Sequence, residues 1–259
     1  MPGELRFGSL AVVEIQMASG HCSLAGLGEK TPLLSEEGGI PSRQKIEVKA
    51  MRYADLPKGV DTAQTVLHDQ AMMEYLISAD TWPFFETRWK LKHGLYMADG
   101  ISQHRMLTVN RGDSNLRYAV PGNRNIRKVF AWLSDLARLF DPPEVQKRWK
   151  ECMEATGALA QSSFGDRIEE MYEIQTLGTA PKAQGNGFAS ALVTTITDMG
   201  DADGHDVWVL TTSAYGFYEM LGFSIIGQAT VGADNPKWDG DPVTLRVMLR
   251  PASTTKGTV

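Results

Sequence analysis

Two glycines, Gly185 and Gly187, lie where an extended segment gives way to a helical one. Residues 172–179 (YEIQTLGT) predict a strand, and the apolar spacing of residues 188–199 predicts a helix with one buried face. The first N–H groups of a helix lack intrahelical partners and its dipole is positive there, so a loop of small residues lets a phosphate approach. A plain tight turn is the alternative, because two glycines alone are weak evidence.

The predicted elements around the glycines favour the phosphate interpretation. Residues 205–212 (HDVWVLTT) predict a second strand, which the helix would connect to the first in a parallel strand–helix–strand unit. In open sheets, ligands bind beyond the carboxyl ends of parallel strands. The sequence therefore predicts an anion site where the first strand ends.

A short helical segment, residues 216–223 (GFYEMLGF), follows the second strand. Together with the pattern Gln-x-x-Gly-x-Ala of residues 184–189, it resembles the GNAT N-acetyltransferase superfamily in order and spacing. The likeness is strong over residues 171–250 and general over residues 46–166, while residues 1–45 match no family. The long helical stretch before Met171 and the Thr-Thr-Ser-Ala segment are similar to the puromycin-acetylating type.

The resemblance implies acetyl-CoA as the co-substrate and no metal. It implies that the backbone of residues 184–189 cradles the pyrophosphate and that the strand edge of residues 177–179 pairs with the pantetheine arm. The residues expected to bind acetyl-CoA are Leu177, Gly178, Thr179, Gln184, Gly185, Asn186, Gly187, Phe188, Ala189 and Ser213.

One position departs from the family pattern. Members often carry an asparagine about seven residues before the motif tyrosine, and this chain has Thr211 there. Ser213 is the candidate substitute for that cofactor contact. The alternative is that Ser213 only caps the following helix.

Tyr218 is the catalytic acid that the resemblance implies. A thiol with a pKa of about 8.5 leaves as a thiolate, and a nearby phenol with a pKa of about 10 can give it a proton through a short hydrogen bond. The alternative is that Tyr218 is a core aromatic residue, which is the role we expect for Phe217 and Phe223.

Glu173 is the candidate general base. It precedes Gln184 by eleven residues, the same offset as the catalytic glutamate in the histone acetyltransferase branch of the superfamily. A lysine-like ammonium has a pKa of about 10.4, so a base must draw off its proton at neutral pH, directly or through water. A solvated strand carboxylate is the alternative, since neighbouring residues on a strand face opposite sides.

The first two helices of this fold usually shape the acceptor pocket, which directs attention to an aromatic stretch. Its members are Trp82, Phe84, Phe85 and Trp89. They predict either an aromatic wall or simply a buried helix face, because Phe85 and Trp89 are four residues apart. Asp80 and Glu86 are candidates for attracting a cationic amine. The histidines show no metal or triad pattern, and we interpret His93, His104 and His205 as structural or surface residues.

Composition excludes several classes of protein. A net charge of -5 gives no support to a nucleic-acid surface, and the spacing of Cys22 and Cys152 fits no metal motif. The apolar run at residues 10–13 is interrupted by Glu14 and is too short for a signal segment or a membrane span. We expect a cytoplasmic protein without a membrane partner. Its oligomeric state, monomer or homodimer, stays open.

The chain of 259 residues predicts one domain with extensions. Residues 1–45 are expected to form a partly flexible extension, residues 46–251 the acetyltransferase domain, and residues 252–259 a tail. A helical insertion is expected at about residues 122–168. The predicted fold is α/β: a mixed, mostly antiparallel central sheet flanked by helices, with a parallel βαβ unit that splays at the acetyl-CoA site.

These observations predict an N-acetyltransferase that transfers acetyl directly from acetyl-CoA to a primary amine of a small molecule. One alternative is a protein or peptide N-acetyltransferase. Another is a non-catalytic module that senses acyl-CoA, which the presence of Tyr218 argues against.

Overall fold

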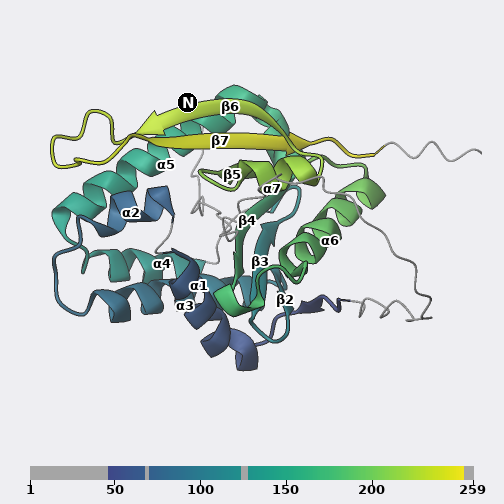
Figure 1. The fold of residues 1–259 in the computed structure, drawn as a ribbon, viewed down its shortest axis with the longest axis horizontal. Coiled ribbons are helices and arrows are strands. Elements are labelled where there is room, and N and C mark those ends of the chain that lie inside the picture. Colours follow the sequence, from purple (N-terminus) through teal and green to yellow (C-terminus); the bar gives the residue numbers. More distant parts are fainter. Residues whose placement is uncertain (1–45, 68–69, 124–127, 254–259) are drawn as a thin grey trace, which may run out of the picture.

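The computed structural model describes residues 46–67, 70–123 and 128–253 (Figure 1). The N-terminal extension predicted at residues 1–45 and the end of the predicted tail, residues 254–259, lie outside this part of the chain.

Seven strands form one sheet. They are β1 (Lys49–Ala50), β2 (Met106–Val109), β3 (Ser114–Ala119), β4 (Tyr172–Thr179), β5 (Val207–Thr211), β6 (Ser224–Val231) and β7 (Val243–Arg250). Their order across the sheet is β1-β2-β3-β4-β5-β7-β6. Only β4 and β5 pair in parallel, and every other pair is antiparallel. The prediction of a mixed, mostly antiparallel α/β sheet is confirmed.

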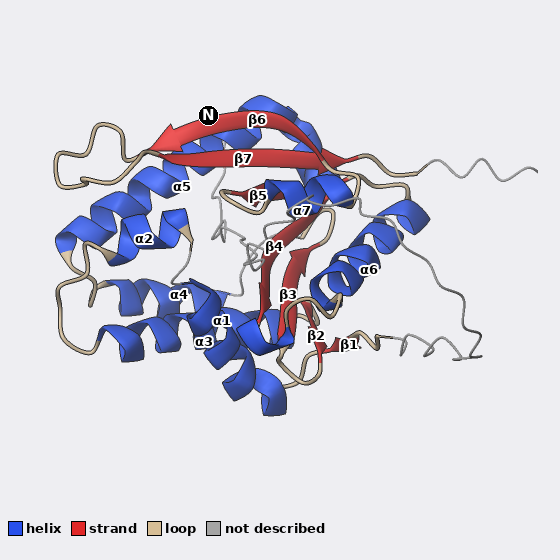
Figure 2. Cartoon of the chain, in the orientation of Figure 1, coloured by secondary structure: helices blue, strands red, loops and turns tan. Residues whose placement is uncertain are grey.

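Helices cover both faces of the sheet (Figure 2). The α-helices are α1 (Leu56–Leu67), α2 (Ala71–Ile77), α3 (Phe85–Ser102), α4 (Lys128–Arg138), α5 (Pro143–Phe164), α6 (Phe188–Asp203) and α7 (Tyr215–Met220). Short 3-10 turns are η1 (Tyr53–Asp55), η2 (Gly165–Glu170) and η3 (Pro181–Ala183). Helices α4 and α5 with η2 occupy the predicted helical insertion.

Strands β4 and β5 separate soon after they meet. Their pairing covers only Tyr172–Ile174 opposite Val207–Val209, whereas β4 stays bonded to β3 as far as Thr179. The β3–β4 register shifts by one residue between Arg117 and Tyr118, which leaves Gln175 as an extra residue on β4. Such a bulge bends its strand and increases the local twist. Among the described strands, none pairs with residues 175–179 on the β5 side.

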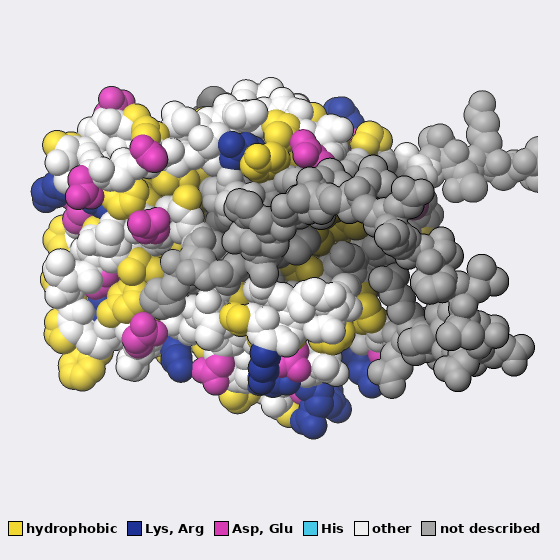
Figure 3. All heavy atoms as spheres, in the orientation of Figure 1, with side chains coloured by type: hydrophobic (Ala, Val, Ile, Leu, Met, Phe, Trp, Pro, Cys, Tyr) yellow, Lys and Arg dark blue, Asp and Glu magenta, His cyan; other side chains and the backbone are white. Residues whose placement is uncertain are grey.

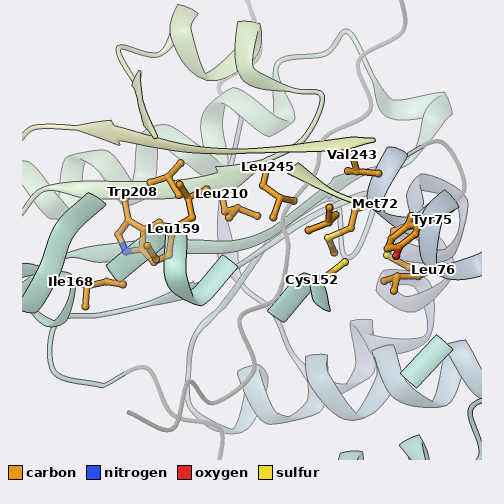
Figure 4. Close-up of a cluster of buried hydrophobic side chains, with 14 of the residues drawn as sticks. Met72, Tyr75, Leu76, Cys152, Leu159, Ile168, Trp208, Leu210, Val243 and Leu245 are labelled. Carbon is orange, nitrogen blue, oxygen red and sulfur yellow. The ribbon is translucent and has the colours of Figure 1, made fainter. Parts of the chain in front are cut away.

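The two largest of the three apolar clusters among the described residues lie on opposite faces of the sheet, and a smaller one surrounds Met97 of α3 and Met106 of β2. Figure 4 shows the first, in which Tyr75 and Leu76 from α2 and Cys152 from α5 pack against the β5–β7 part of the sheet, including Trp208. The second joins α6 and α7 to β3, β4 and β5, and Leu192, Ile196 and Val209 are fully buried in it. Alternation along β5 explains the division, because Trp208 faces one core and its neighbours Val207 and Val209 face the other.

The start of α5 differs in detail from the sequence pattern. We expect Asp141 to cap this helix, but the N-cap is Pro142 and no side chain caps it. The Asp141 carboxylate instead accepts a hydrogen bond from Lys92 on α3, 2.7 Å away. Asp141 thus forms an ion pair with α3 and does not cap α5.

Charged side chains are dispersed over the surface. On the face shown in Figure 3, acidic and basic side chains of the described residues are interspersed. No helix among the described residues is long and apolar enough to cross a membrane.

Candidate active site

The loop before α6 has the backbone conformation that its glycines allow. Gly185 has φ of 76° and Gly187 has φ of 77°, both in the left-handed region that L-residues rarely adopt. A Cβ placed on Gly185 would have no heavy atom within 4 Å, so the space beside this residue is open. Gly187 is the N-cap of α6 and places the loop directly at the positive end of the helix.

Side chains in the same loop hold its shape. Asn186 donates from Nδ2 to the carbonyl oxygens of Ala183, at 3.0 Å, and Gln184, at 3.2 Å. Gln184 donates from Nε2 to the carbonyl oxygen of Thr179, at 3.3 Å, which ties the loop to the end of β4. The polar side chains point back into the protein, and backbone groups are left to face a ligand.

Strand β4 reaches the loop with one edge open. Residues 177–179 pair with β3 on one side, through Leu116, Asn115 and Ser114, and have no described strand on the other. Every second residue along such an edge presents an N–H and a C=O group that need partners. The open edge and the glycine loop are consecutive in the chain, so one extended ligand can contact both.

Tyr218 lies on α7, in the apolar cluster that also holds Ile174 and Leu177 of β4. Its ring is fully buried and packs edge-on against Phe217 and Phe223, with centroids 5.2 and 5.4 Å away. The aromatic neighbours therefore fix the ring on the α6 face of the β4–β5 separation. The expectation that Phe217 and Phe223 are core residues is confirmed.

Glu173 lies on β4 and is 3% exposed, which is too little for the solvated carboxylate that we held as the alternative. Its Oε2 accepts a hydrogen bond from Gln175 Nε2 at 3.3 Å, and Gln175 Oε1 accepts one from Arg117 at 3.0 Å. Arg117 in turn pairs with the buried Asp99 at 2.6 Å. Since Ile174 faces the α6 side, strand alternation directs Glu173 to the opposite face.

The segment before α7 corrects one expectation. Ser213 is exposed and does not cap the helix, whose N-cap is Ala214 without a side-chain hydrogen bond. Thr211 stabilises this segment instead, since its Oγ1 accepts a hydrogen bond from the Ala214 N–H at 3.2 Å. The Ser213 side chain is therefore not occupied by capping, and its contact with a cofactor stays a prediction.

A cavity of about 160 Å³ opens on the face that carries α1 and α3. Its floor is formed by Asn115 of β3 and by Thr176, Leu177 and Gly178 of β4. One face of α3 forms a wall, with lining residues at the helical spacing of Trp89, Lys92, His93, Tyr96 and Met97. The cavity thus reaches, from the helix face, the same β4 residues whose edge is open.

The residues of the predicted aromatic stretch lie in two places: some belong to or support the cavity wall, and others are exposed on the protein surface. Trp89 lines the cavity, and Phe85 packs against it with ring centroids 5.8 Å apart. Trp82 and Phe84 are exposed and are not among the lining residues. Asp80 does not line the cavity either, because it pairs with Arg88. Of the predicted aromatic stretch, only Trp89 therefore lines the cavity, and Phe85 supports it from behind.

A family comparison identifies the region that contains these elements. Residues 149–223, from α5 through α7, match the family model described as Acetyltransferase (GNAT) family. Residues 149–223 of the chain are thus similar to GNAT acetyltransferases. A search of curated protein sequences gives no match.

Solved structures share the GNAT fold at low identity. Arylalkylamine N-acetyltransferase 2 from Aedes aegypti is 14% identical, with a TM-score of 0.55 over 80% of this chain and 99% of that one. A mutant agmatine N-acetyltransferase in its apo form gives 14% identity and a TM-score of 0.52, with the same coverage of both chains. At these identities the likeness shows the fold alone.

His93 and Asn115 line the cavity, and the sequence interpretation missed both. His93 was interpreted as structural or surface, yet its ring lines the cavity. Its position four residues after Trp89 and three before Tyr96 was a signal that it shares their helix face. Asn115 gave no such signal, because its place beside Gly178 depends on the β3–β4 register.

Proposed function

We propose that this chain transfers an acetyl group from acetyl-CoA directly to the primary amine of a small molecule. One observation carries the proposal: residues 176–178 of β4 line the cavity from the helix face, while the open edge of the same strand faces the β4–β5 separation. A donor bound along the edge and an acceptor held in the cavity would meet at this strand.

The residues proposed to bind the acetyl donor, which are those of the glycine loop and the open edge of β4, fit coenzyme A. A pyrophosphate requires N–H donors and close backbone approach, which the open space at Gly185 and the start of α6 offer. A pantetheine arm carries amide groups, which the free edge of residues 177–179 can pair by backbone hydrogen bonds. We propose that Gln184, Asn186, Phe188 and Ala189 contribute to this site through their backbone, and that Ser213 borders it.

When bound, acetyl-CoA supplies the acetyl group as a thioester. The reaction forms a C–N bond and breaks the C–S bond, so one proton must leave the amine and one must reach the sulfur. We propose that Tyr218, on the α6 face, donates a proton to the sulfur. We propose that Glu173, directed to the opposite face, takes the amine proton through water, and its carboxylate is bonded to the buried chain of Gln175 and Arg117.

A free-thiol release assay tests the proposal. With acetyl-CoA and a panel of aryl and alkyl amines, polyamines, amino acids, nucleoside amines and lysine peptides, we expect thiol release that requires both substrates and an N-acetylated product by mass spectrometry. Turnover restricted to peptides would support a protein N-acetyltransferase instead. Binding of coenzyme A without turnover of any amine would support an acyl-CoA sensor and contradict the proposal.

A further inference from the structure

The cavity on the α3 face offers almost no negative charge. Its charged lining residues are Lys92, Arg138 and Asp141, and the single carboxylate is neutralised by the 2.7 Å contact between Asp141 Oδ1 and Lys92 Nζ. Lys92 also lies over the Trp89 ring, 4.3 Å from its centroid, which holds the ammonium against the wall. A second cation on a bound amine would therefore find no free counter-charge among the described lining residues.

The remaining wall is mostly apolar. Its larger members are Val66, Met72, Met73, Trp89, Val145 and Trp149. An apolar cavity of about 150 Å³ is large enough to bind benzene, so the volume of about 160 Å³ corresponds to roughly one aromatic ring. Size and lining together favour a compact apolar group.

The polar groups of the cavity offer hydrogen bonds rather than charge. His93 Nδ1 lies 2.9 Å from the Trp89 carbonyl oxygen, which can only accept, so Nδ1 carries the hydrogen and Nε2 is left as an acceptor. Burial lowers the pKa of His93 to about 4, so the ring is neutral near pH 7. Asn115 is 3% exposed, and its Nδ2 has no hydrogen-bond partner among the described residues.

An unpaired, buried amide at the cavity floor is costly unless a ligand or water supplies its partner. Asn115 lies opposite Gly178 in the β3–β4 ladder, next to the strand edge where the acetyl group is proposed to arrive. Asn115 therefore places a hydrogen-bonding group at the β4 end of the cavity.

We propose that the cavity takes a primary amine carried on one uncharged, apolar group of about the size of an aromatic ring, and that it discriminates against amines with a second cation. This inference rests on the proposed function, since it names the acceptor class of that same site.

Binding, measured separately from turnover, tests the inference. Calorimetric titration of the protein saturated with coenzyme A should show phenethylamine binding at least tenfold more tightly than agmatine or 1,4-diaminobutane. Equal or tighter binding of the diamines, or no binding of phenethylamine, would overturn it. Thiol release with the same amines addresses the proposed function independently: phenethylamine that binds but is not acetylated refutes acetyl transfer and leaves the assignment of the cavity intact.

Two variants locate the selectivity in the cavity. Ser134 lines the cavity from α4 and is half-buried, so Ser134→Glu adds a carboxylate without removing a large contact. It should shift the binding ratio at least tenfold toward the diamines, while the matched control Ser134→Gln should leave the ratio unchanged. Lys92→Met, which unpairs Asp141, should shift the ratio in the same direction. An unchanged ratio in both Ser134→Glu and Lys92→Met would show that amines do not bind here.

Discussion

At the scale of single residues, the glycine loop is the most distinctive part of the donor site. Gly185 and Gly204 lie at opposite ends of α6, both with positive φ and both without an atom within 4 Å of an added Cβ. Gly185→Ala should lose about 1 kcal/mol of stability through backbone strain and should also weaken coenzyme A binding, because the methyl group enters the cradle. Thermal unfolding and calorimetric titration measure the two effects.

Gly204→Ala is the matched control for this prediction. It carries the same backbone strain at the end of α6 that is remote from the loop. It should lose similar stability and keep the parent affinity for coenzyme A. If both variants bind coenzyme A equally, the loop does not hold the pyrophosphate.

Tyr218 makes a second prediction at this scale. Tyr218→Phe keeps the ring that packs between Phe217 and Phe223 and removes only the hydroxyl group. We expect kcat to fall by about 10²- to 10⁴-fold, the usual contribution of a general acid, with little change in the affinity for coenzyme A. Steady-state kinetics and titration of the same preparation check it, and a parent-like kcat would remove the acid role.

The third prediction at the residue scale concerns Glu173, the proposed general base. Glu173→Gln retains the shape of the side chain beside Gln175 but cannot accept a proton. We expect activity to fall most at low pH, where unprotonated amine is scarce and a base is needed most. The measurement is the pH profile of kcat/KM, with acceptors of different amine pKa. A profile that coincides with the parent at every pH would assign the base elsewhere.

At the scale of elements, an ion pair fastens α6 to β7. Arg250 donates from two nitrogens to both oxygens of Asp201, at 2.9 and 2.8 Å, and these hydrogen bonds lower the pKa of Asp201 to about 2. Because the folded-state pKa lies below the unfolded value of about 3.8, the pair stabilises the fold fully above pH 4, and this contribution disappears as pH falls through about 2.

Asp201→Asn should therefore lose about 1 kcal/mol at pH 7, discounted for the partial exposure of both side chains, and much less at pH 2, where about half of the carboxyl is protonated. The control is Asp61→Asn, which breaks the more exposed ion pair between α1 and Lys90 of α3 and should change stability much less than Asp201→Asn does at pH 7. Denaturant unfolding at both pH values measures the difference. Equal losses for Asp201→Asn at pH 7 and pH 2 would contradict the role of the ion pair.

The elements nearest the glycine loop were the most predictable ones. Strand β4 was predicted with its observed bounds because its apolar run ends just before Pro181, and α6 was predicted because Leu192, Val193 and Ile196 share one face. The first strand was harder to predict: residues 46–51 (IEVKAM) alternate like a full strand, but only Lys49–Ala50 pair with β2. Alternating apolar and polar residues indicate that successive side chains face opposite sides of an extended segment. They do not indicate whether a neighbouring strand is long enough to pair with that segment.

At the scale of the whole molecule, the elements of the proposed donor site could be predicted from the sequence, and the cavity could not. The glycine loop, β4 and α7 are close in sequence, so local patterns and a family resemblance identify them together. The cavity combines α1, α2, α3, α4, α5, β3 and β4, and its charge balance depends on the contact between Lys92 and Asp141, which are 49 residues apart. Such pairs are set by tertiary packing and leave no local signature. The similarity to the puromycin-acetylating type likewise stays a prediction.

The central claim is that the donor and the acceptor approach β4 from opposite faces and meet at its open edge. A crystal structure with coenzyme A and a bound amine tests it most directly. We expect the pyrophosphate at the backbone of residues 184–189, the pantetheine arm paired along residues 177–179, and the amine in the cavity beside His93 and Asn115. Coenzyme A bound away from the glycine loop, or an amine outside the cavity on the α3 face, would contradict the account.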